Sequence, residues 1–506
     1  MKHSLPHFHV SIHFALLLAI GLLSPSRALP AEFTVELGAD AAAAPITGRL
    51  YVFLSQREGN EPRFGPDWFS PEPFYGVDVR DFRSGENRRV DDTADAFPDK
   101  PSRLPAGTYR AQAVLDHDFY HQHHAQGVGN LYSRVQEFTV EDGSASELKL
   151  TLDQVVAVEP FPDSQWVREA VFTSKLLSDF HGREVLDRAA VVLPASYHEQ
   201  PDRRYPVIYS IPGFSGSHRD GLRYAERPPT PGEGETEFIS VMLSGQCKWG
   251  HHVYADSAAN GPRGESLVRE LVPHVDEHFR TVAAPTARFV TGHSSGGWSA
   301  LWLQVAYPDV FGGVWSLSPD PVDFRDYQQV DLYASPPLSL YRDEEGNRRP
   351  LARVGDRPVL WYDSFGKMDD CLGRGGQLRS FEAVFSPLDS AGPPRRLWDR
   401  ETGRIDPETA KAWEAYDIRL VLQRNWPTLG PKLSGKLHIT TGSLDTFYLE
   451  GAVERLAETL KELNSDAQVA ILEGETHGSL LKPELFSQIR RQMSDSFRSH
   501  HPEPAD

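Results

Sequence analysis

Cysteine is scarce in this chain, since its 506 residues contain only Cys247 and Cys371. Two cysteines exclude a disulfide-built scaffold, and they cannot form a zinc cage unless histidines complete it. Export into an oxidising compartment permits one disulfide, and pairing of Cys247 with Cys371 is our hypothesis. Two free buried thiols are the alternative, because cysteine is often used as a small apolar residue.

Long hydrophobic runs are also lacking beyond the first residues. A positive residue, Lys2, precedes the apolar run Phe14–Leu23, and the small-residue stretch Ser26-Arg27-Ala28 follows it. This order predicts a signal peptide over residues 1–28, whereas a membrane span needs about 20 apolar residues. We therefore expect a secreted or periplasmic protein with no membrane span.

Basic residues are outnumbered, with 52 Lys and Arg against 71 Asp and Glu, a formal charge of −19. Loss of residues 1–28 removes Lys2 and Arg27 and no acidic residue, which brings the charge to −21. An acidic surface repels phosphate backbones, so no nucleic-acid partner is expected.

The hydrophobic pattern divides the chain into two parts. From residue 32 to about 152, apolar residues alternate with a period of two, which predicts a small N-terminal β-sandwich domain over residues 29–160. After Pro160-Phe161-Pro162, strand and helix patterns alternate. This predicts an α/β domain over residues 161–497, with a mostly parallel sheet covered by helices on both faces. Residues 498–506 are expected to form a disordered tail.

A nucleophile elbow is predicted at Gly292-His293-Ser294-Ser295-Gly296. The sequence has the form Gly-x-Ser-x-Gly, in which glycines allow a tight strand-to-helix turn that exposes the serine hydroxyl. A strand pattern at 287–291 precedes it and a helix pattern at 298–307 follows. This context favours Ser294 as a catalytic nucleophile over an ordinary Gly/Ser-rich loop.

A serine nucleophile needs a base and an acid that orients the base. Asp445 follows the predicted strand 436–440, and His477 follows the predicted strand 468–472. The chain order serine, acid, histidine is that of α/β-hydrolases. Taken singly, Asp445 would also suit a helix N-cap and His477 a solvated loop.

Other residues of the chain are candidates for the same roles. Asp363 is the second candidate acid, but it precedes the strand expected to carry the acid loop. His293 is expected to point away from the nucleophile, and His438 to pack within a strand. A solvated loop is favoured over a surface metal site for the histidine patch of the β-domain, which contains His117, His121, His123 and His124.

Two backbone N–H groups are needed to stabilise the developing oxyanion. We assign one to Ser295, at the start of the predicted helix, and the other to Phe214, in the loop after the predicted strand 205–211. An ordinary Pro-Gly turn is the alternative for the second loop.

Five motifs together resemble the putative-esterase family of α/β-hydrolases, which includes enterochelin, feruloyl and acetyl-xylan esterases, S-formylglutathione hydrolase and mycolyltransferases. They are Tyr205–Phe214, Gly292–Gly297, Tyr307–Phe311, Gly442–Asp445 and Thr476–Gly478. The resemblance covers roughly residues 165–495 and implies an α/β-hydrolase fold. The sequence departs from the family pattern at Pro212, where relatives with a His-Gly pair carry histidine.

The long separation of Ser294 from Asp445 is a second departure, and it implies an insertion at about 321–435. We interpret this insertion as part of a lid. It contains the segment 367–376 and a helix-like stretch at 407–422.

The sequence thus predicts an exported serine hydrolase that cleaves a small-molecule or carbohydrate ester through an acyl-enzyme, with no cofactor and no metal. Acyl transfer to a sugar or alcohol, a prolyl-oligopeptidase-like peptidase and an inactive binding protein remain alternatives. The aromatic stretch 64–75 of the β-domain could stack against a substrate or pack between the domains.

Overall fold

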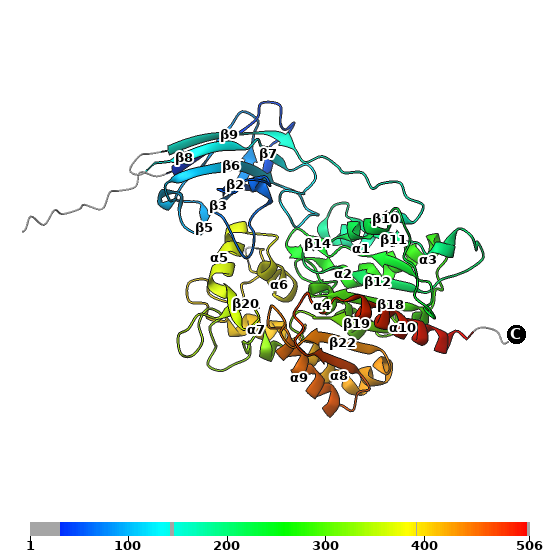
Figure 1. Ribbon diagram of the computed structural model, residues 1–506. Helices are drawn as coiled ribbons and strands as arrows, with labels where there is room; N and C mark the ends of the chain where they lie inside the picture. Colours follow the sequence, from blue (N-terminus) through cyan, green and yellow to red (C-terminus); the bar gives the residue numbers. More distant parts are fainter. Residues whose placement is uncertain (1–30, 142–145, 391, 503–506) are drawn as a thin grey trace, which may run out of the picture.

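The computed structural model describes residues 31–141, 146–390 and 392–502 (Figure 1). The predicted signal peptide, residues 1–28, lies outside the described residues. Two parts are visible in Figure 1, an all-β part built from the N-terminal third and a larger α/β part.

Nine strands of the N-terminal part are hydrogen-bonded in one connected sheet, in the order β4-β1-β9-β7-β6-β2-β3-β5, with β8 paired to β6. The alternating pattern buries one face of these strands around a separate core that includes Phe33, Val52, Tyr75 and Leu150. The strands are β1 (Ala31–Leu37), β2 (Ile46–Ser55), β3 (Phe74–Phe82), β4 (Asn87–Val90), β5 (Asp95–Phe97), β6 (Gly107–Asp116), β7 (Leu131–Ser133), β8 (Gln136–Val140) and β9 (Ser146–Val155).

An eight-stranded sheet forms the centre of the second part, in the order β10-β11-β13-β12-β18-β19-β22-β23. The pairs β10-β11 and β11-β13 are antiparallel, and all other neighbours are parallel. Its strands are β10 (Val167–Thr173), β11 (Leu186–Val192), β12 (Val207–Ile211), β13 (Ile239–Met242), β18 (Arg288–His293), β19 (Gly313–Leu317), β22 (Leu437–Gly442) and β23 (Gln468–Leu472). This confirms the predicted α/β-hydrolase fold.

Helices cover both faces of this sheet. On one face Ile489 and Met493 of α10 pack against Phe289 and Trp315, whereas the helices α4 and α9 contribute to the main core on the other. The helices are α1 (Lys175–His181), α2 (Arg263–Ser266), α3 (Val272–His278), α4 (Ser295–Ala306), α5 (Tyr362–Leu372), α6 (Gln377–Phe385), α7 (Pro407–Trp413), α8 (Ile418–Leu433), α9 (Glu450–Glu462) and α10 (Pro483–His500).

Some local predictions differ from the structure. The stretch 407–422 contains two helices rather than one, since α7 ends at Trp413 and α8 begins at Ile418. Asp417 is the N-cap of α8, and its side chain accepts a hydrogen bond from Leu420 N. The helix α10 runs to His500, so the first residues of the expected tail 498–506 are helical. Residues 503–506 lie outside the described part of the chain.

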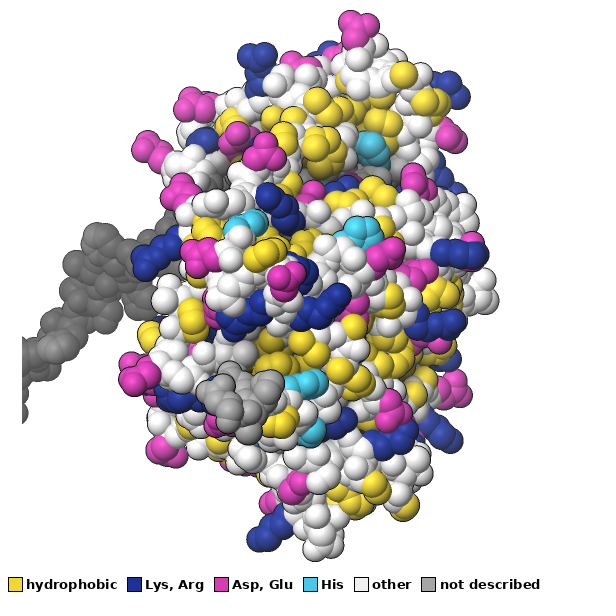
Figure 2. Space-filling model, turned by 90° about the vertical axis from the view of Figure 1, so that its right-hand side faces the viewer, with side chains coloured by type: hydrophobic (Ala, Val, Ile, Leu, Met, Phe, Trp, Pro, Cys, Tyr) yellow, Lys and Arg dark blue, Asp and Glu magenta, His cyan; other side chains and the backbone are white. Residues whose placement is uncertain are grey.

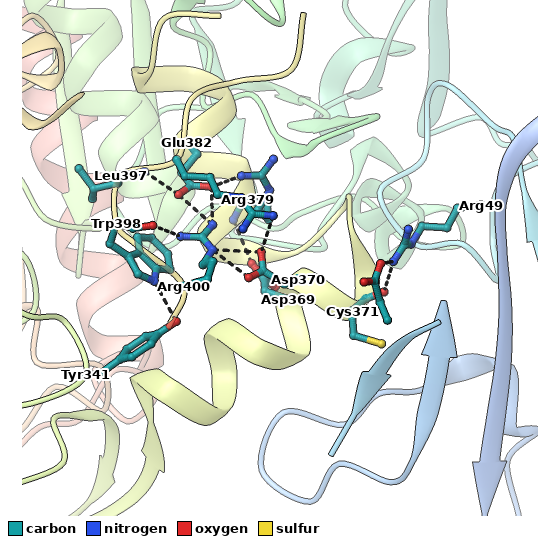
Figure 3. Close-up of polar contacts among 12 residues, drawn as sticks. Arg49, Tyr341, Asp369, Asp370, Cys371, Arg379, Glu382, Leu397, Trp398 and Arg400 are labelled. Atoms are coloured by element: carbon teal, nitrogen blue, oxygen red, sulfur yellow. Dashed lines mark hydrogen bonds and ion pairs between the residues drawn. The ribbon is translucent and has the colours of Figure 1, made fainter. Parts of the chain in front are cut away.

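The segment between β19 and β22 carries α5 to α8 and the hairpin β20 (Pro350–Val354) and β21 (Arg357–Trp361). Buried ion pairs hold it together (Figure 3). Arg400 donates to Asp370 of α5 at 2.8 Å and to both carboxylate oxygens of Glu382 of α6 at 2.9 and 2.8 Å. Its guanidinium also lies 3.7 Å from the centre of the Trp398 ring. Helices α5 and α6 are therefore fixed to each other.

The N-terminal domain packs on this inserted segment, with α5 against β3 and β5 (Figure 1). Arg49 Nη2 donates to the carbonyl of Cys371 at 2.8 Å (Figure 3), and Tyr51 Oη donates to the carbonyl of Leu372 at 2.6 Å. Phe74 of the N-terminal domain belongs to the same buried cluster as Cys371 and the main α/β core. The two domains therefore share a continuous apolar core.

Acidic and basic side chains are interspersed on the face shown in Figure 2, so the acidic excess does not form a single patch there. Among the described residues, no helix has the length and apolar character needed to cross a bilayer.

Candidate active site

The predicted elbow forms a sharp turn between β18 and α4. Ser294 has φ 60° and ψ −127°, a conformation that a non-glycine residue adopts only when its surroundings impose it. A Cβ on Gly292 would lie 2.1 Å from the carbonyl oxygen of Gly296, and one on Gly296 would lie 2.1 Å from that of Ile211. Both glycines are therefore required for this turn, as the motif predicts.

Asp445 and His477 meet beyond the ends of β22 and β23. His477 Nδ1 lies 2.8 Å from Asp445 Oδ2, and Asp445 is fully buried. Because a carboxylate only accepts, Nδ1 carries the proton and Nε2 is left with a free lone pair. Asp445 Oδ1 also accepts from Phe447 N at 2.8 Å, and α9 begins at Glu450 with Leu449 as its N-cap. Asp445 is therefore not a helix cap.

His293 holds the backbone of His477, the predicted base, through a hydrogen bond. Its Nε2 donates to the carbonyl of His477 at 2.8 Å, and the two ring centres are 4.4 Å apart. Burial, with the neighbouring His477 adding to it, lowers the pKa of His293 to about 4, so the ring is neutral at pH 7. The hydrogen bond therefore directs the His293 ring towards the backbone of His477.

The loop after β12 lies directly against the nucleophile. A Cβ on Gly213 would lie 3.4 Å from Ser294 Cβ. Among the described residues, no hydrogen bond takes up the N–H of Phe214. The N–H of Ser295 is at the first position of α4, where helix donors have no partner within the helix. The two predicted oxyanion donors therefore flank Ser294.

A cavity of about 320 Å³ joins these groups. Ser294, His477 and the loop 213–215 line one side. Besides Phe214 of that loop, the aromatic residues of the lining are Trp68, Phe365, Phe381 and Phe447, and its polar residues include Asp320, Gln328 and Gln377. Helices α5 and α6 contribute Phe365 and Phe381 to the cavity wall.

Trp68 is the one wall residue from the N-terminal domain among those named. Its ring centre lies 5.5 Å from that of Phe214 and 5.1 Å from that of Phe365, the latter at 90°. Trp68 therefore both packs between the domains and faces the cavity, and stacking of the stretch 64–75 on a substrate stays a prediction.

Asp320 was not predicted as a site residue. Its Oδ2 accepts from Ser295 Oγ at 2.5 Å, and burial raises its pKa to about 6. Gln377 Nε2 donates to the same Ser295 hydroxyl at 3.2 Å. The position of Asp320 shortly after β19, at the same edge of the sheet as the other site residues, is the only signal that the sequence offers.

The remaining candidates lie outside the cavity. Asp363, on α5, accepts a hydrogen bond from Arg348 Nε at 2.9 Å. His438 stacks on Trp315, with ring centres 4.4 Å apart. In the histidine patch, His124 Nε2 is bonded to the carbonyl of Arg63 at 2.8 Å and His117 Nε2 to that of Gly129 at 2.9 Å. The described residues contain no group of three or more His, Cys, Asp and Glu that could hold a metal.

The disulfide hypothesis is wrong for this structure, in which Cys247 and Cys371 are free and buried. Cys247 Sγ donates to Asn260 Oδ1 at 3.4 Å, whereas Cys371 Sγ donates to the carbonyl of Phe74 at 3.5 Å. Each thiol thus has a separate partner. Burial raises the pKa of both thiols, which makes them poor nucleophiles.

His251 anchors the loop that carries Phe214. Its Nε2 donates to the carbonyl of Pro212 at 3.2 Å and its Nδ1 accepts from Val253 N at 3.0 Å, an arrangement that requires a neutral ring. Burial lowers its pKa to about 4. Because the unfolded chain binds the proton more tightly, the stability from this site is full above about pH 6.5 and is lost as the pH falls towards about 4.

We expect His251→Gln to lower the free energy of unfolding, with a deficit against wild type that is largest near pH 7.5. The deficit should shrink by up to about 3 kcal/mol by pH 4. Urea unfolding at pH 7.5, 6, 5 and 4 measures it, with the exposed His278→Gln as control. A deficit that is constant with pH would show that His251 does not titrate in this range.

Comparison with known proteins gives one family match. A family model described as "Putative esterase" matches residues 247–478. No curated protein matches the chain.

Solved structures with similar folds include three hydrolases. A ferulic acid esterase has 13% identity and a TM-score of 0.41, covering 65% of this chain and 98% of its own. The fluorophosphonate-binding serine hydrolase FphF of Staphylococcus aureus has 15% identity and a TM-score of 0.39, with 65% and 98% covered. An S-formylglutathione hydrolase from Agrobacterium tumefaciens has 13% identity and a TM-score of 0.38, with 66% and 98% covered.

Proposed function

We propose that this protein is a carboxylic ester hydrolase in which Ser294, His477 and Asp445 cleave the ester through an acyl-enzyme. The match of residues 247–478 to the putative-esterase model supports this proposal. The observation that carries the proposal is the 2.8 Å contact of His477 Nδ1 with buried Asp445, together with the cavity that His477 and Ser294 both line. No hydrogen bond joins Ser294 Oγ to His477 within the described residues. Such bonds often form only when substrate is bound.

In the first half-reaction Ser294 Oγ attacks the ester carbonyl carbon while His477 Nε2 takes its proton. The carbonyl oxygen becomes negative and accepts hydrogen bonds from the N–H groups of Phe214 and Ser295. The C–O bond to the alcohol then breaks, and His477 returns the proton to the departing oxygen. Asp445 stabilises the imidazolium throughout.

In the second half-reaction a water molecule attacks the acyl carbon after giving a proton to His477. The bond to Ser294 Oγ breaks, Ser294 regains the proton, and the carboxylic acid leaves. A sugar or alcohol in place of water would give acyl transfer by the same residues. The predicted signal peptide supports action outside the cytoplasm.

The aromatic wall favours an apolar or aryl group on the substrate. Chromogenic esters of differing chain length, acetylated sugars and feruloyl esters form the test panel, with Ser294→Ala as control and product analysis in the presence of sugar acceptors. Turnover lost with Ser294→Ala supports the proposal. A new sugar ester in place of free acid would assign acyl transfer, and turnover that survives in Ser294→Ala would refute the proposed nucleophile.

Trp68→Ala is expected to lower kcat/KM mainly for large esters, by about 10-fold, since a ring in the cavity wall contributes binding energy remote from the reacting bond. A small acetate ester should be affected less than about threefold. Phe69→Ala is the matched control, because Phe69 is in the same loop but half-exposed. Equal losses on both esters, with a lower Tm, would assign Trp68 to interdomain packing alone.

A further inference from the structure

The loop that carries Phe214 is a tight turn with a strained third residue. Gly216 N donates to the carbonyl of Gly213 at 3.1 Å, which closes a four-residue turn. Ser215, its third residue, has φ 71°. A turn with positive φ at this position prefers glycine or asparagine, so serine needs outside support to stay there.

That support comes from two glutamine side chains. Ser215 N donates to Gln122 Oε1 at 3.2 Å, and Gln246 Nε2 donates to the carbonyl of Ser215 at 3.0 Å. Both peptide groups of Ser215 are thereby fixed. Gln246 is close in the fold, in the strand β14 (Gln246–Cys247), but Gln122 belongs to the N-terminal domain and is 8% exposed.

The segment that presents Gln122, residues 117–130 between β6 and β7, is itself well fixed. Asn130 Oδ1 accepts from His117 N at 2.9 Å and from Asp118 N at 3.0 Å, while its Nδ2 donates to Asp116 at 2.7 Å. Its internal bonds leave the segment little freedom, so Gln122 is held in a defined position.

Contacts with the insertion fix the same segment from the other side. Arg374 forms an ion pair with buried Asp116 at the start of the segment. A Cβ on Gly375 would lie 2.3 Å from the carbonyl oxygen of Gln122, so the two backbones are in close contact. The bond from Arg49 to Cys371 joins the domains nearby (Figure 3).

We propose that Gln122 is a positioning residue for catalysis, through which the N-terminal domain holds the strained turn and so places the N–H of Phe214 at the oxyanion. This inference rests on the proposed function, which makes Phe214 an oxyanion donor. The N-terminal domain then serves the reaction itself and not only substrate binding.

Gln122→Ala is expected to lower kcat on a small acetate ester by roughly 10- to 100-fold with KM little changed. A donor displaced by about 1 Å costs rates of this size, and loss of a donor costs more. Gln122→Glu keeps an acceptor oxygen and should stay within a few-fold of wild type. Gln126→Ala, an exposed position in the same segment, is the matched control and should not change kcat.

Ser215→Gly provides the decisive partner variant, because glycine adopts positive φ without steric cost. The kcat of the double variant Gln122→Ala/Ser215→Gly should be close to that of Ser215→Gly alone, so that the loss seen in Gln122→Ala is mostly restored in the glycine background. A kcat for Gln122→Ala within twofold of wild type, or a loss accompanied by a lower Tm that Ser215→Gly does not restore, would overturn the inference. Ser294→Ala separates failure of this inference from failure of the proposed function. If Ser294→Ala is inactive and Gln122→Ala is fully active, only the positioning role of Gln122 is refuted.

Discussion

Replacement of Ser294 by alanine is expected to lower kcat on every ester by about 10⁴- to 10⁶-fold. Only the oxyanion donors and substrate binding would remain, and they leave a small residual rate over water. The backbone at this position is held by the packing of Gly292 and Gly296, so the variant should fold with a Tm close to that of wild type. Steady-state rates on an activated chromogenic ester measure the effect.

Ser499→Ala, an exposed serine in α10, controls for handling and should match wild type. More than about 10% of the wild-type rate remaining in a well-folded Ser294→Ala preparation would contradict the nucleophile assignment.

Asp445→Asn is expected to cost about 10⁴-fold in kcat. The wild-type carboxylate is fully buried and accepts from His477 Nδ1 and from Phe447 N, so it fixes both the tautomer and the orientation of the ring. An amide in its place can present its NH2 to Nδ1, which puts the imidazole proton on Nε2, where a lone pair is required. KM should change far less than kcat.

Asp363→Asn is the matched control, because Asp363 is the other candidate acid and pairs with Arg348 away from the cavity. It should leave kcat within about threefold of wild type. A larger loss of kcat in Asp363→Asn than in Asp445→Asn would show that the catalytic acid had been assigned to the wrong loop.

The elbow was predictable from sequence because its chemistry is local. Five adjacent residues, a preceding strand and a following helix define the turn, and the glycine contacts depend on no distant insertion. Asp445 and His477 were predictable as spatial neighbours for a related reason. They follow late strands of a parallel sheet, whose carboxyl ends share one edge, so chain order alone brings Asp445 near His477.

The rest of the site depends on contacts between distant parts of the chain. Gln122 meets Ser215 across 93 residues, and Gln377 meets Ser295 across 82. Neither pairing leaves a spacing or composition signal in one sequence. The proposed pairing of Cys247 with Cys371 failed for the same reason, because the sequence does not show which groups surround each thiol. In the structure Cys247 bonds to the side-chain amide of Asn260, and Cys371 bonds to the carbonyl of Phe74.

The helix boundaries show how local chemistry corrects a pattern. The stretch 407–422 was interpreted as helix-like, but Asp417 caps a new helix by accepting a hydrogen bond from the N–H of Leu420 at 2.9 Å. An N-cap side chain competes successfully with continuation of the helix at that point. Within the segment between β19 and β22, α8 packs on α4.

The most direct test of the central claim is covalent labelling with a fluorophosphonate, followed by peptide mass spectrometry of wild type and Ser294→Ala. We expect one adduct per chain in wild type, on the peptide that contains Ser294, and none in the variant. An adduct on another residue, or equal labelling of Ser294→Ala, would contradict the assignment of Ser294 as the nucleophile.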